Sequence, residues 1–351
     1  MFTQTLKQRV LGSDLVNLLT GPHGVDRYTE VVDPAWTRAE GRATIVDVRR
    51  DTPRSVTLVL VPNQAFTDTV TAGQYVNLAV EIDGRRHTRC YSPANAEGAA
   101  YLELTIGQHD GGLVSTYLCK HARPGMVVGL TGVGGDFVLP AQCPRRILFV
   151  SGGSGITPVM AMVRTLVNQG HAGEIAFVHY ARSRAEACYH DELAALPGVR
   201  VLHGYTRSGG GDLEGRFDAQ HLAAAMPEPD AVFVCGPAAL VEAVRGQSAD
   251  ARSESFVPPV LDIPTKPSGG RVTFSGSAVE VTDDGRSLLE QAESAGLNPA
   301  SGCRMGICHT CTRRKTSGVV RNLTSGAVST APDEHVQICV SVPVGDVDIA
   351  L

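Results

Sequence analysis

The chain has 351 residues, with 31 Lys and Arg, 36 Asp and Glu, and a hydrophobic fraction of 43%. This length allows two or three domains with their own cores, and the composition is typical of globular proteins rather than disordered or fibrous ones. The net charge of −5, without a basic patch, argues against nucleic acid as a partner.

Residues 1–40 contain one amphipathic stretch, LKQRVLGSDLVNLLT, which Gly21 and Pro22 terminate. We expect an N-terminal helical extension that packs on the chain's own core or docks on a partner or a membrane. The N-terminus lacks the apolar region of a signal peptide, and no run of 18 apolar residues predicts a membrane span. The sequence therefore predicts a cytoplasmic protein with at most a peripheral contact at the inner face of the membrane.

Residues 41–142 contain short alternating runs such as RSVTLVLV and AYLELTIGQ, which predict an antiparallel β-barrel or sandwich. Over residues 143–256, buried apolar runs such as EIAFVHY alternate with helical stretches, a pattern that predicts a parallel α/β sheet. Residues 257–269 are rich in proline and predict a linker. Residues 270–351 predict a hairpin, a helix over residues 287–296 and then a cysteine-rich loop.

Four cysteines of this last segment have a distinctive spacing: Cys303, Cys308 and Cys311 in SGCRMGICHTC, and Cys339 in HVQICVS. The pattern C-x4-C-x2-C with a distant fourth cysteine is typical of plant-type 2Fe-2S ligands. Zinc is a weaker alternative, because zinc ribbons usually have two C-x2-C pairs and only one is present. Disulfides are also a weak alternative in a reducing compartment.

Residues 271–351 resemble a plant-type ferredoxin of the α+β, β-grasp fold over their whole length. The resemblance implies that the four cysteines bind one 2Fe-2S cluster, which carries one electron at a time. We also expect the nearby cations to contact an electron acceptor, namely Arg304, Arg313, Arg314 and Lys315.

Two motifs of the second segment resemble the flavin site of the ferredoxin–NADP reductase superfamily. HTRCYSPAN contains Arg89, Tyr91 and Ser92, and the loop in GQHDGGLVSTYL contains Gly112, Leu113, Val114, Ser115 and Thr116. Alone, each motif is more often a surface strand or a helix cap. The resemblance implies that Arg89 neutralises a flavin phosphate, Tyr91 stacks on the flavin and Ser92 lies at its reactive edge. The long loop favours FAD, with FMN as the alternative.

The stretch ILFVSGGSGITPVMAMV resembles the nicotinamide domain of the same superfamily. Its Gly152, Gly153 and Gly155 allow backbone N–H groups to approach a pyrophosphate at a helix start, and Thr157 adds a hydroxyl group. The motif VCGP supplies Cys235, Gly236 and Pro237, and the family's cysteine packs there against nicotinamide. A small buried residue at a strand end is the alternative for Cys235.

The choice of nicotinamide depends on the residues after the second parallel strand. Arg182, Ser183 and Arg184 provide cations and a hydroxyl group before the first acid, which favours NADPH over NADH. Arginines that form surface ion pairs are the alternative.

The order of the three domains resembles reductase components that serve oxygenases and desaturases, and most closely actinobacterial oxidoreductases of fatty-acyl desaturases. The resemblance implies an NAD(P)H-dependent oxidoreductase that passes electrons through FAD and a 2Fe-2S cluster. It also implies that Ser92 and Cys235 shape the contact between nicotinamide and flavin across which the hydride passes. The implied acceptor is a membrane di-iron desaturase. A ring-hydroxylating dioxygenase, an alkane hydroxylase or a haem monooxygenase is the alternative acceptor, and an iron–sulfur redox sensor is the non-enzyme alternative.

Overall fold

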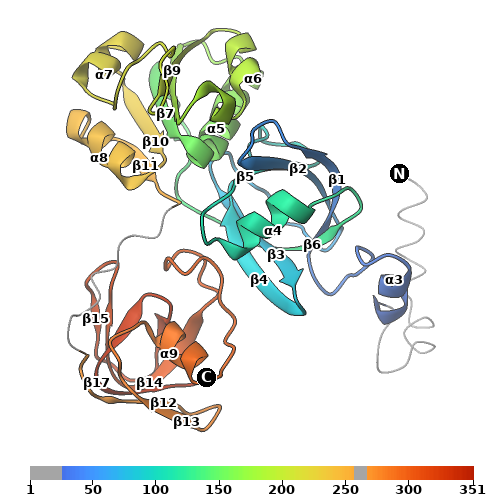
Figure 1. Cartoon of the computed structure of the whole chain (residues 1–351), viewed down its shortest axis with the longest axis vertical. Coiled ribbons are helices and arrows are strands. Elements are labelled where there is room, and N and C mark those ends of the chain that lie inside the picture. Colours follow the sequence, from blue (N-terminus) through green and yellow to red (C-terminus); the bar gives the residue numbers. More distant parts are fainter. Residues whose placement is uncertain (1–25, 257–266) are drawn as a thin grey trace.

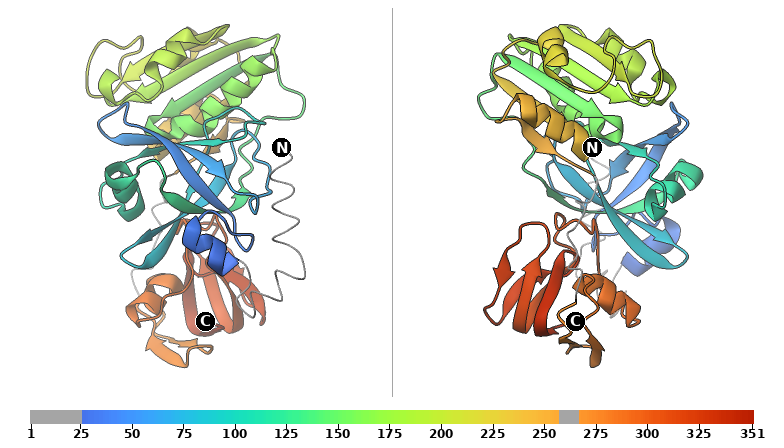
Figure 2. Two further views of the ribbon diagram at one scale, coloured as in Figure 1. Left: turned by 90° about the vertical axis from the view of Figure 1, so that its right-hand side faces the viewer. Right: turned by 60° about the vertical axis from the view of Figure 1, so that its left-hand side comes forward.

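The computed structural model describes residues 26–256 and 267–351, which form three units, each built around one sheet (Figure 1). The N-terminal unit lies between the middle and C-terminal units, and two further views show the same order (Figure 2). The amphipathic stretch at residues 6–20 and most of the expected linker lie outside the described residues. This confirms the expected fold class, which is an antiparallel unit followed by a parallel α/β unit and an α+β unit.

The N-terminal unit is an antiparallel sheet with the strand order β4-β3-β6-β1-β2-β5. Alternating apolar side chains fill one side of this sheet, and Ile45, Leu58 and Leu104 are fully buried there. Its elements are α3 (Asp26–Val32), β1 (Arg42–Arg49), β2 (Ser55–Pro62), β3 (Tyr75–Ile82), β4 (Arg85–Tyr91), β5 (Leu102–Gly107), α4 (Leu113–His121) and β6 (Val127–Gly134).

The middle unit is a parallel sheet with the strand order β11-β10-β7-β8-β9. Residues 147–150 of its central strand are apolar and fully buried because helices cover both faces. Phe149, Phe177 and Phe233 form the centre of the core. Its elements are β7 (Arg146–Gly152), η2 (Gly153–Gly155), α5 (Ile156–Asn168), β8 (Glu174–Ala181), η3 (Arg184–Glu186), α6 (His190–Ala195), β9 (Val199–Tyr205), α7 (Ala219–Ala225), β10 (Ala231–Cys235), α8 (Ala238–Gln247) and β11 (Arg252–Glu254).

The C-terminal unit is a mixed sheet in which β12 and β17 are parallel and the other pairs are antiparallel. Ser287 begins the helix with a capping box, and Leu288, Leu289 and Ala292 pack on the sheet. The elements of this unit are β12 (Arg271–Phe274), β13 (Val279–Thr282), α9 (Leu288–Ser294), β14 (Thr312–Asn322), β15 (Val328–Ser329), β16 (Glu334–Gln337) and β17 (Ser341–Ile349).

A group of charged residues around the buried Glu103 joins the N-terminal and middle units. Glu103 on β5 accepts hydrogen bonds from Arg49 on β1 and from Arg164 on α5, and the Arg164 Nη1–Glu103 Oε1 distance is 2.7 Å. Arg164 also reaches Glu192 on α6, with an Nη2–Oε2 distance of 2.6 Å. The two units therefore meet in a polar contact as well as an apolar one.

The described part of the N-terminal extension is held on the first sheet by one side chain. Asn63 Nδ2 donates to the backbone oxygens of Ala35, Thr37 and Glu40, each at 3.2 Å. This contact places the segment between α3 and β1 against the end of β2.

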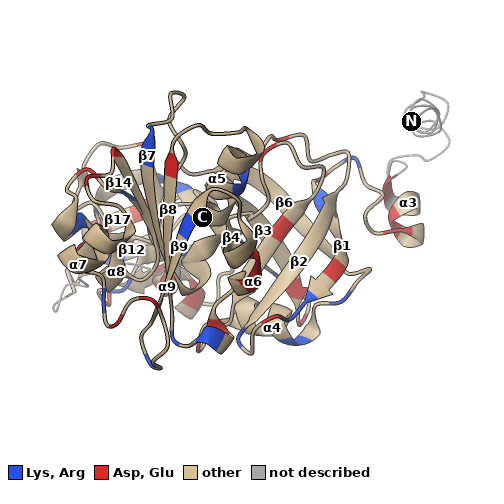
Figure 3. Cartoon of the chain, turned by 90° about the horizontal axis from the view of Figure 1, so that it is seen from above, with Lys and Arg blue, Asp and Glu red and all other residues tan. Residues whose placement is uncertain are grey.

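Seen from above, acidic and basic positions alternate along the ribbon, and neither sign dominates (Figure 3). Within residues 26–256 and 267–351, none of the helices has both the length and the apolar character needed to cross a membrane.

Candidate active site

A cavity of about 400 Å³ opens between β4, β5 and the start of α4. Arg89, Tyr91 and Ser92 line this cavity, and so do four residues of the predicted second motif: Gly112, Leu113, Val114 and Ser115. The structure therefore brings the two predicted flavin motifs to one site.

The polar character of this cavity suits a flavin. The Ser92 hydroxyl group is buried, and within the described residues Oγ has no hydrogen-bond partner, which is costly unless a ligand supplies one. Burial raises the pKa of the Tyr91 phenol, so its ring stays neutral. A planar cofactor with polar ring edges fits these two side chains.

The second motif forms the start of α4, with Gly112 at the N-cap. A Cβ atom at Gly112 would lie 2.6 Å from Ser115 Oγ, which in turn accepts a hydrogen bond from the His109 N–H at 3.2 Å. Thr116 does not line the cavity, and its N–H donates to the Gly112 oxygen as the first helical bond. The N–H groups at a helix start favour an anionic group such as a phosphate.

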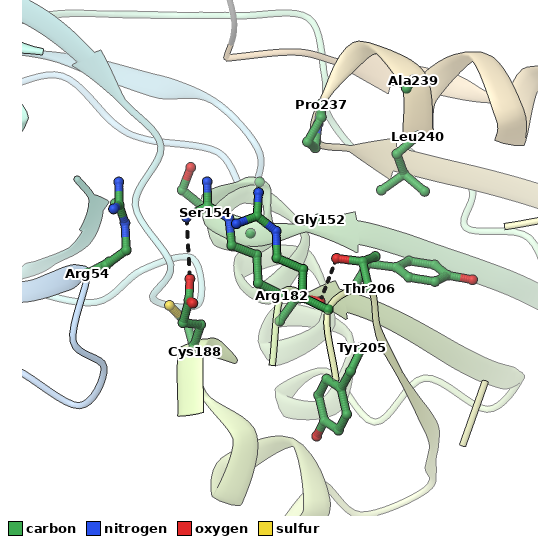
Figure 4. A pocket seen from close by; sticks show the side chains of 18 of the residues that line it. Arg54, Gly152, Ser154, Arg182, Cys188, Tyr205, Thr206, Pro237, Ala239 and Leu240 are labelled. Carbon is green, nitrogen blue, oxygen red and sulfur yellow. Dashed lines mark hydrogen bonds and ion pairs between the residues drawn. The ribbon is translucent and has the colours of Figure 1, made fainter. Parts of the chain in front are cut away.

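A second cavity of about 720 Å³ lies at the carboxyl ends of the parallel strands (Figure 4). Gly152, Gly153 and Gly155 line it, as predicted for a nicotinamide site. A Cβ atom at Gly155 would lie 2.4 Å from the Cys235 backbone oxygen, so the glycine lets η2 pack on the end of β10. Thr157 lines the first cavity instead.

The cationic edge of the second cavity differs from the one the sequence predicts. Arg182 lines the cavity, with Nη1 3.7 Å from the Glu186 carboxylate, whereas Ser183 and Arg184 do not line it. Thr206 and Arg207, which follow β9, lie on the same edge, as Figure 4 shows for Arg182 and Thr206. The loop after β9 thus adds groups that the sequence pattern did not single out.

Cys235 ends β10 and is completely buried, while its neighbours Gly236 and Pro237 line the second cavity. Burial raises the pKa of the Cys235 thiol well above its ordinary value. The side chain is therefore a neutral thiol beneath the cavity floor.

Two further residues in or beside the site were missed by the sequence reasoning. Glu254 on β11 lies opposite Cys235, its Oε2 is buried without a partner among the described residues, and burial raises its pKa to about 8. Phe256 lines both cavities. The only sequence signal was an acid and an aromatic residue directly before the proline-rich segment.

The cysteine loop surrounds two of the predicted ligands with backbone donors. Cys303 Sγ accepts hydrogen bonds from the N–H groups of Met305, Ile307 and Cys308 at 3.3, 3.4 and 3.3 Å. Cys308 Sγ accepts one from the Cys303 N–H at 3.1 Å. Donors that converge on sulfur stabilise a metal-bound thiolate, so this loop fits an iron–sulfur cluster.

The other two predicted ligands, Cys311 and Cys339, are buried, and the nearness of Cys339 lowers the pKa of the Cys311 thiol. The four thiols therefore form two pairs, as a cluster with two irons requires. A Cβ atom at Gly302 would lie 2.5 Å from Cys308 Sγ, and Gly306 has a φ of 75°. Both glycines are needed for the loop to close around a cluster.

The expectation that the cations near the cluster contact an electron acceptor is wrong for Lys315. Its side chain is fully buried, and Nζ donates to the backbone oxygens of Gly318 and Ala331. The other three cations have intramolecular partners: Arg304 with Glu293, Arg314 with Asp333, and Arg313 with the oxygen of Ala300. Lys315 is therefore part of the domain's interior.

The three predicted sites are contiguous in space. Cys303 and Met305 of the cysteine loop line the first cavity together with Tyr91. Four residues line both cavities: Gly107, His109, Ser154 and Phe256. Arg89 Nη1 donates to the Gly302 oxygen at 3.0 Å, so the side chain expected at a flavin phosphate also contacts the cysteine loop.

Three domain families match consecutive parts of the chain. They are an oxidoreductase FAD-binding domain at residues 50–139, an oxidoreductase NAD-binding domain at residues 149–246 and a 2Fe-2S iron-sulfur cluster binding domain at residues 272–344. An NADPH oxidoreductase of Mycobacterium tuberculosis is 35% identical over 93% of this chain and 89% of its own length. The chain belongs to the ferredoxin–NADP reductase superfamily. This reductase is an oxidoreductase with FAD, NAD and 2Fe-2S domains, as the motifs predicted.

Other relatives match most of the chain. A glycine betaine monooxygenase reductase subunit of Pseudomonas aeruginosa is 27% identical over 91% of the chain and 97% of its own length. The solved structure of phthalate dioxygenase reductase superposes with a TM-score of 0.61 at 21% identity, covering 88% of the chain and 97% of that structure. The latter likeness shows a common fold.

Proposed function

We propose that the reductase passes electrons from NADPH, through FAD and a 2Fe-2S cluster, to an oxygenase-type acceptor protein. The observation that carries this proposal is the lining of the first cavity. Tyr91 and Ser92 of the flavin motif share that cavity with the cluster ligand Cys303 and with Ser154 of the nicotinamide motif. Residues expected to bind the electron donor, the flavin and the cluster therefore lie around one cavity.

The residues of the site bind and orient the cofactors rather than supply the redox chemistry. A flavin held by these residues would supply the chemistry that takes a hydride from nicotinamide and releases electrons singly, which would suit a cluster that accepts one. In our proposal, Arg89 and the residues 112–115 hold the anionic part of FAD, and Tyr91 stacks on its ring. Ser92 offers its unpartnered hydroxyl group to the reacting edge, and Cys235 supports the nicotinamide from below.

NADPH is the proposed donor because the second cavity offers cations without a competing ribose-binding acid beyond the paired Glu186. Arg182 and Arg207 replace Arg184 as the proposed 2′-phosphate contacts, because they line the cavity. We expect Arg207→Ala to reduce kcat/KM for NADPH at least tenfold and to leave that for NADH almost unchanged. Equal losses with both nucleotides would contradict this assignment.

The proposed acceptor class rests on the relatives and on the order of the domains. One relative is the reductase subunit of a glycine betaine monooxygenase. By analogy, we propose that the acceptor of this reductase is also an oxygenase. Within this class, the resemblance of the sequence favours a membrane di-iron fatty-acyl desaturase. Reconstitution with such a desaturase and with a ring-hydroxylating dioxygenase separates the two, because only the true partner turns over its substrate with NADPH.

The electron path is tested with the Cys308→Ser variant. We expect wild type to reduce cytochrome c steadily with NADPH, and Cys308→Ser to lose that activity while NADPH still bleaches the flavin absorption. Cys143→Ser, a change at a thiol outside all three sites, is the matched control and should retain both activities. A wild type with a reducible cluster but no turnover would favour a redox sensor instead.

A further inference from the structure

The outer face of β3 and β4 carries three side chains that the proposed function does not use. Asn77 on β3 lies directly opposite Cys90 on β4, and Tyr75 is two residues before Asn77. Because successive side chains of a strand point to opposite faces, these three share one face. Their neighbours Val76 and Leu78 point the other way, into the core of the sheet.

This face contacts the cysteine loop of the C-terminal unit. The Tyr75 hydroxyl group donates to the Ile307 backbone oxygen at 3.1 Å. The Cys90 sulfur forms a group with the sulfurs of Cys303 and Cys308 in which all three atoms lie within 4.8 Å of one another. The thiol of the N-terminal unit therefore lies against one of the two ligand pairs of the proposed cluster.

The proton of the Cys90 thiol has its own acceptor. Cys90 Sγ donates to Asn77 Oδ1 at 3.2 Å. A thiol has a single proton, so while that proton bonds to Asn77, the sulfur has no proton left for the nearby sulfurs of Cys303 and Cys308.

We propose that Cys90 is a positioning residue of the cluster site: a fifth thiol, hydrogen-bonded to Asn77, whose sulfur lies beside the Cys303–Cys308 pair without being a ligand. The inference rests on the proposed 2Fe-2S cluster. Four other thiols already supply two ligands for each iron. The negative end of the thiol dipole then faces the ligand sulfurs and disfavours an added electron, which lowers the reduction potential of the cluster.

The first test measures the cluster itself. Wild type, Cys90→Ala, Asn77→Leu and the control Cys143→Ala are purified with flavin and cluster, and the reduced-to-oxidised ratio is followed by EPR at one fixed potential. We expect the first two variants to increase this ratio about threefold or more. Cys90→Ala removes the sulfur, and Asn77→Leu releases the thiol proton toward the ligands. Cys143→Ala should match wild type.

Three results would overturn the inference: an unchanged ratio in Cys90→Ala, a decreased ratio, or loss of iron in Cys90→Ala, since iron loss would mean that Cys90 is a ligand. These results differ from a failure of the proposed function. If the wild-type protein gives no 2Fe-2S EPR signal, the proposed function itself is wrong. If the signal is present but Cys90→Ala leaves the reduced-to-oxidised ratio unchanged, only the proposed role of Cys90 is wrong.

A second test addresses the contact without requiring a cluster. In the full-length Cys308→Ser chain, the thiol oxidant diamide takes two electrons and two protons from a pair of thiols that then form a disulfide. We expect peptide mass spectrometry to find Cys90 joined to Cys303, and the added change Cys90→Ser to abolish that product. Recovery of Cys90 only as a free thiol, while Cys311 and Cys339 become joined, would contradict the docked arrangement.

Discussion

Glu254 shows how burial controls a single carboxyl group at the site. Its folded-state pKa of about 8 lies above the ordinary value of 4.5, because burial disfavours the charged form. The folded state therefore binds the proton more tightly than the unfolded state does. This costs stability progressively as the pH rises from about 4.5 to about 8, and the full cost applies above that.

We expect Glu254→Gln to remove this cost. Relative to wild type, the variant should gain up to about 3 kcal/mol more stability at pH 8.5 than at pH 5.5, because one pKa unit corresponds to about 1.4 kcal/mol. Thermal unfolding of the two proteins at both pH values measures the difference. Glu242→Gln, at an exposed position of α8, is the control. The same gain at both pH values would contradict the buried, protonated carboxyl group.

At the scale of one element, the cysteine loop depends on a glycine beside a ligand. A Cβ atom at Gly302 would approach Cys308 Sγ to 2.5 Å and Thr310 Oγ1 to 3.0 Å. We expect Gly302→Ala to lower the iron content to less than half of the wild-type value while flavin content stays unchanged. Iron assay and the visible spectrum measure both quantities. Gly246→Ala on α8, where a Cβ atom meets open space, should retain both cofactors.

The sequence predicted elements whose signal is local. Alternation in RSVTLVLV gave the antiparallel strand β2, and the C-x4-C-x2-C spacing gave a loop that surrounds Cys303 with N–H donors. Lys315 was assigned wrongly because a basic run in sequence does not show which side chain turns inward. The backbone oxygens that bind it, at Gly318 and Ala331, become acceptors only once β14 is folded.

For the whole molecule, the domain order was predictable, but the contacts between domains were not. The bonds from Tyr75 to Ile307 and from Arg89 to Gly302 join residues more than 200 positions apart. No periodicity or motif encodes such a pair, since each partner is a backbone oxygen whose direction depends on the folded loop. The cavity on which the proposed function rests forms only when the units contact each other in this way. The motifs predicted the residues that line it, but not that they would share one cavity.

The contact between the N-terminal and middle units, which frames both cavities, depends on Glu103. Burial raises the pKa of Glu103, but Arg164 and Arg49 outweigh that effect, and the net pKa is lowered. A lowered pKa means that the carboxylate stabilises the folded state above about pH 4.5 and loses this effect as the pH falls. We expect Glu103→Gln to cost about 3 kcal/mol at pH 7, because it leaves a largely buried Arg164 with one partner fewer.

A double-mutant cycle tests whether Glu103 and Arg164 act as a pair. Glu103→Gln, Arg164→Gln and the double variant are compared by chemical unfolding at pH 7 and pH 4. The double variant should lose less than the sum of the single losses, because removing both charges leaves no unpaired partner. Arg54→Gln, which breaks the exposed pair with Asp110, should leave the stability almost unchanged. Two results would contradict a charged contact between the units. One is that the losses of unfolding free energy are strictly additive, and the other is that the loss caused by Glu103→Gln is as large at pH 4 as at pH 7.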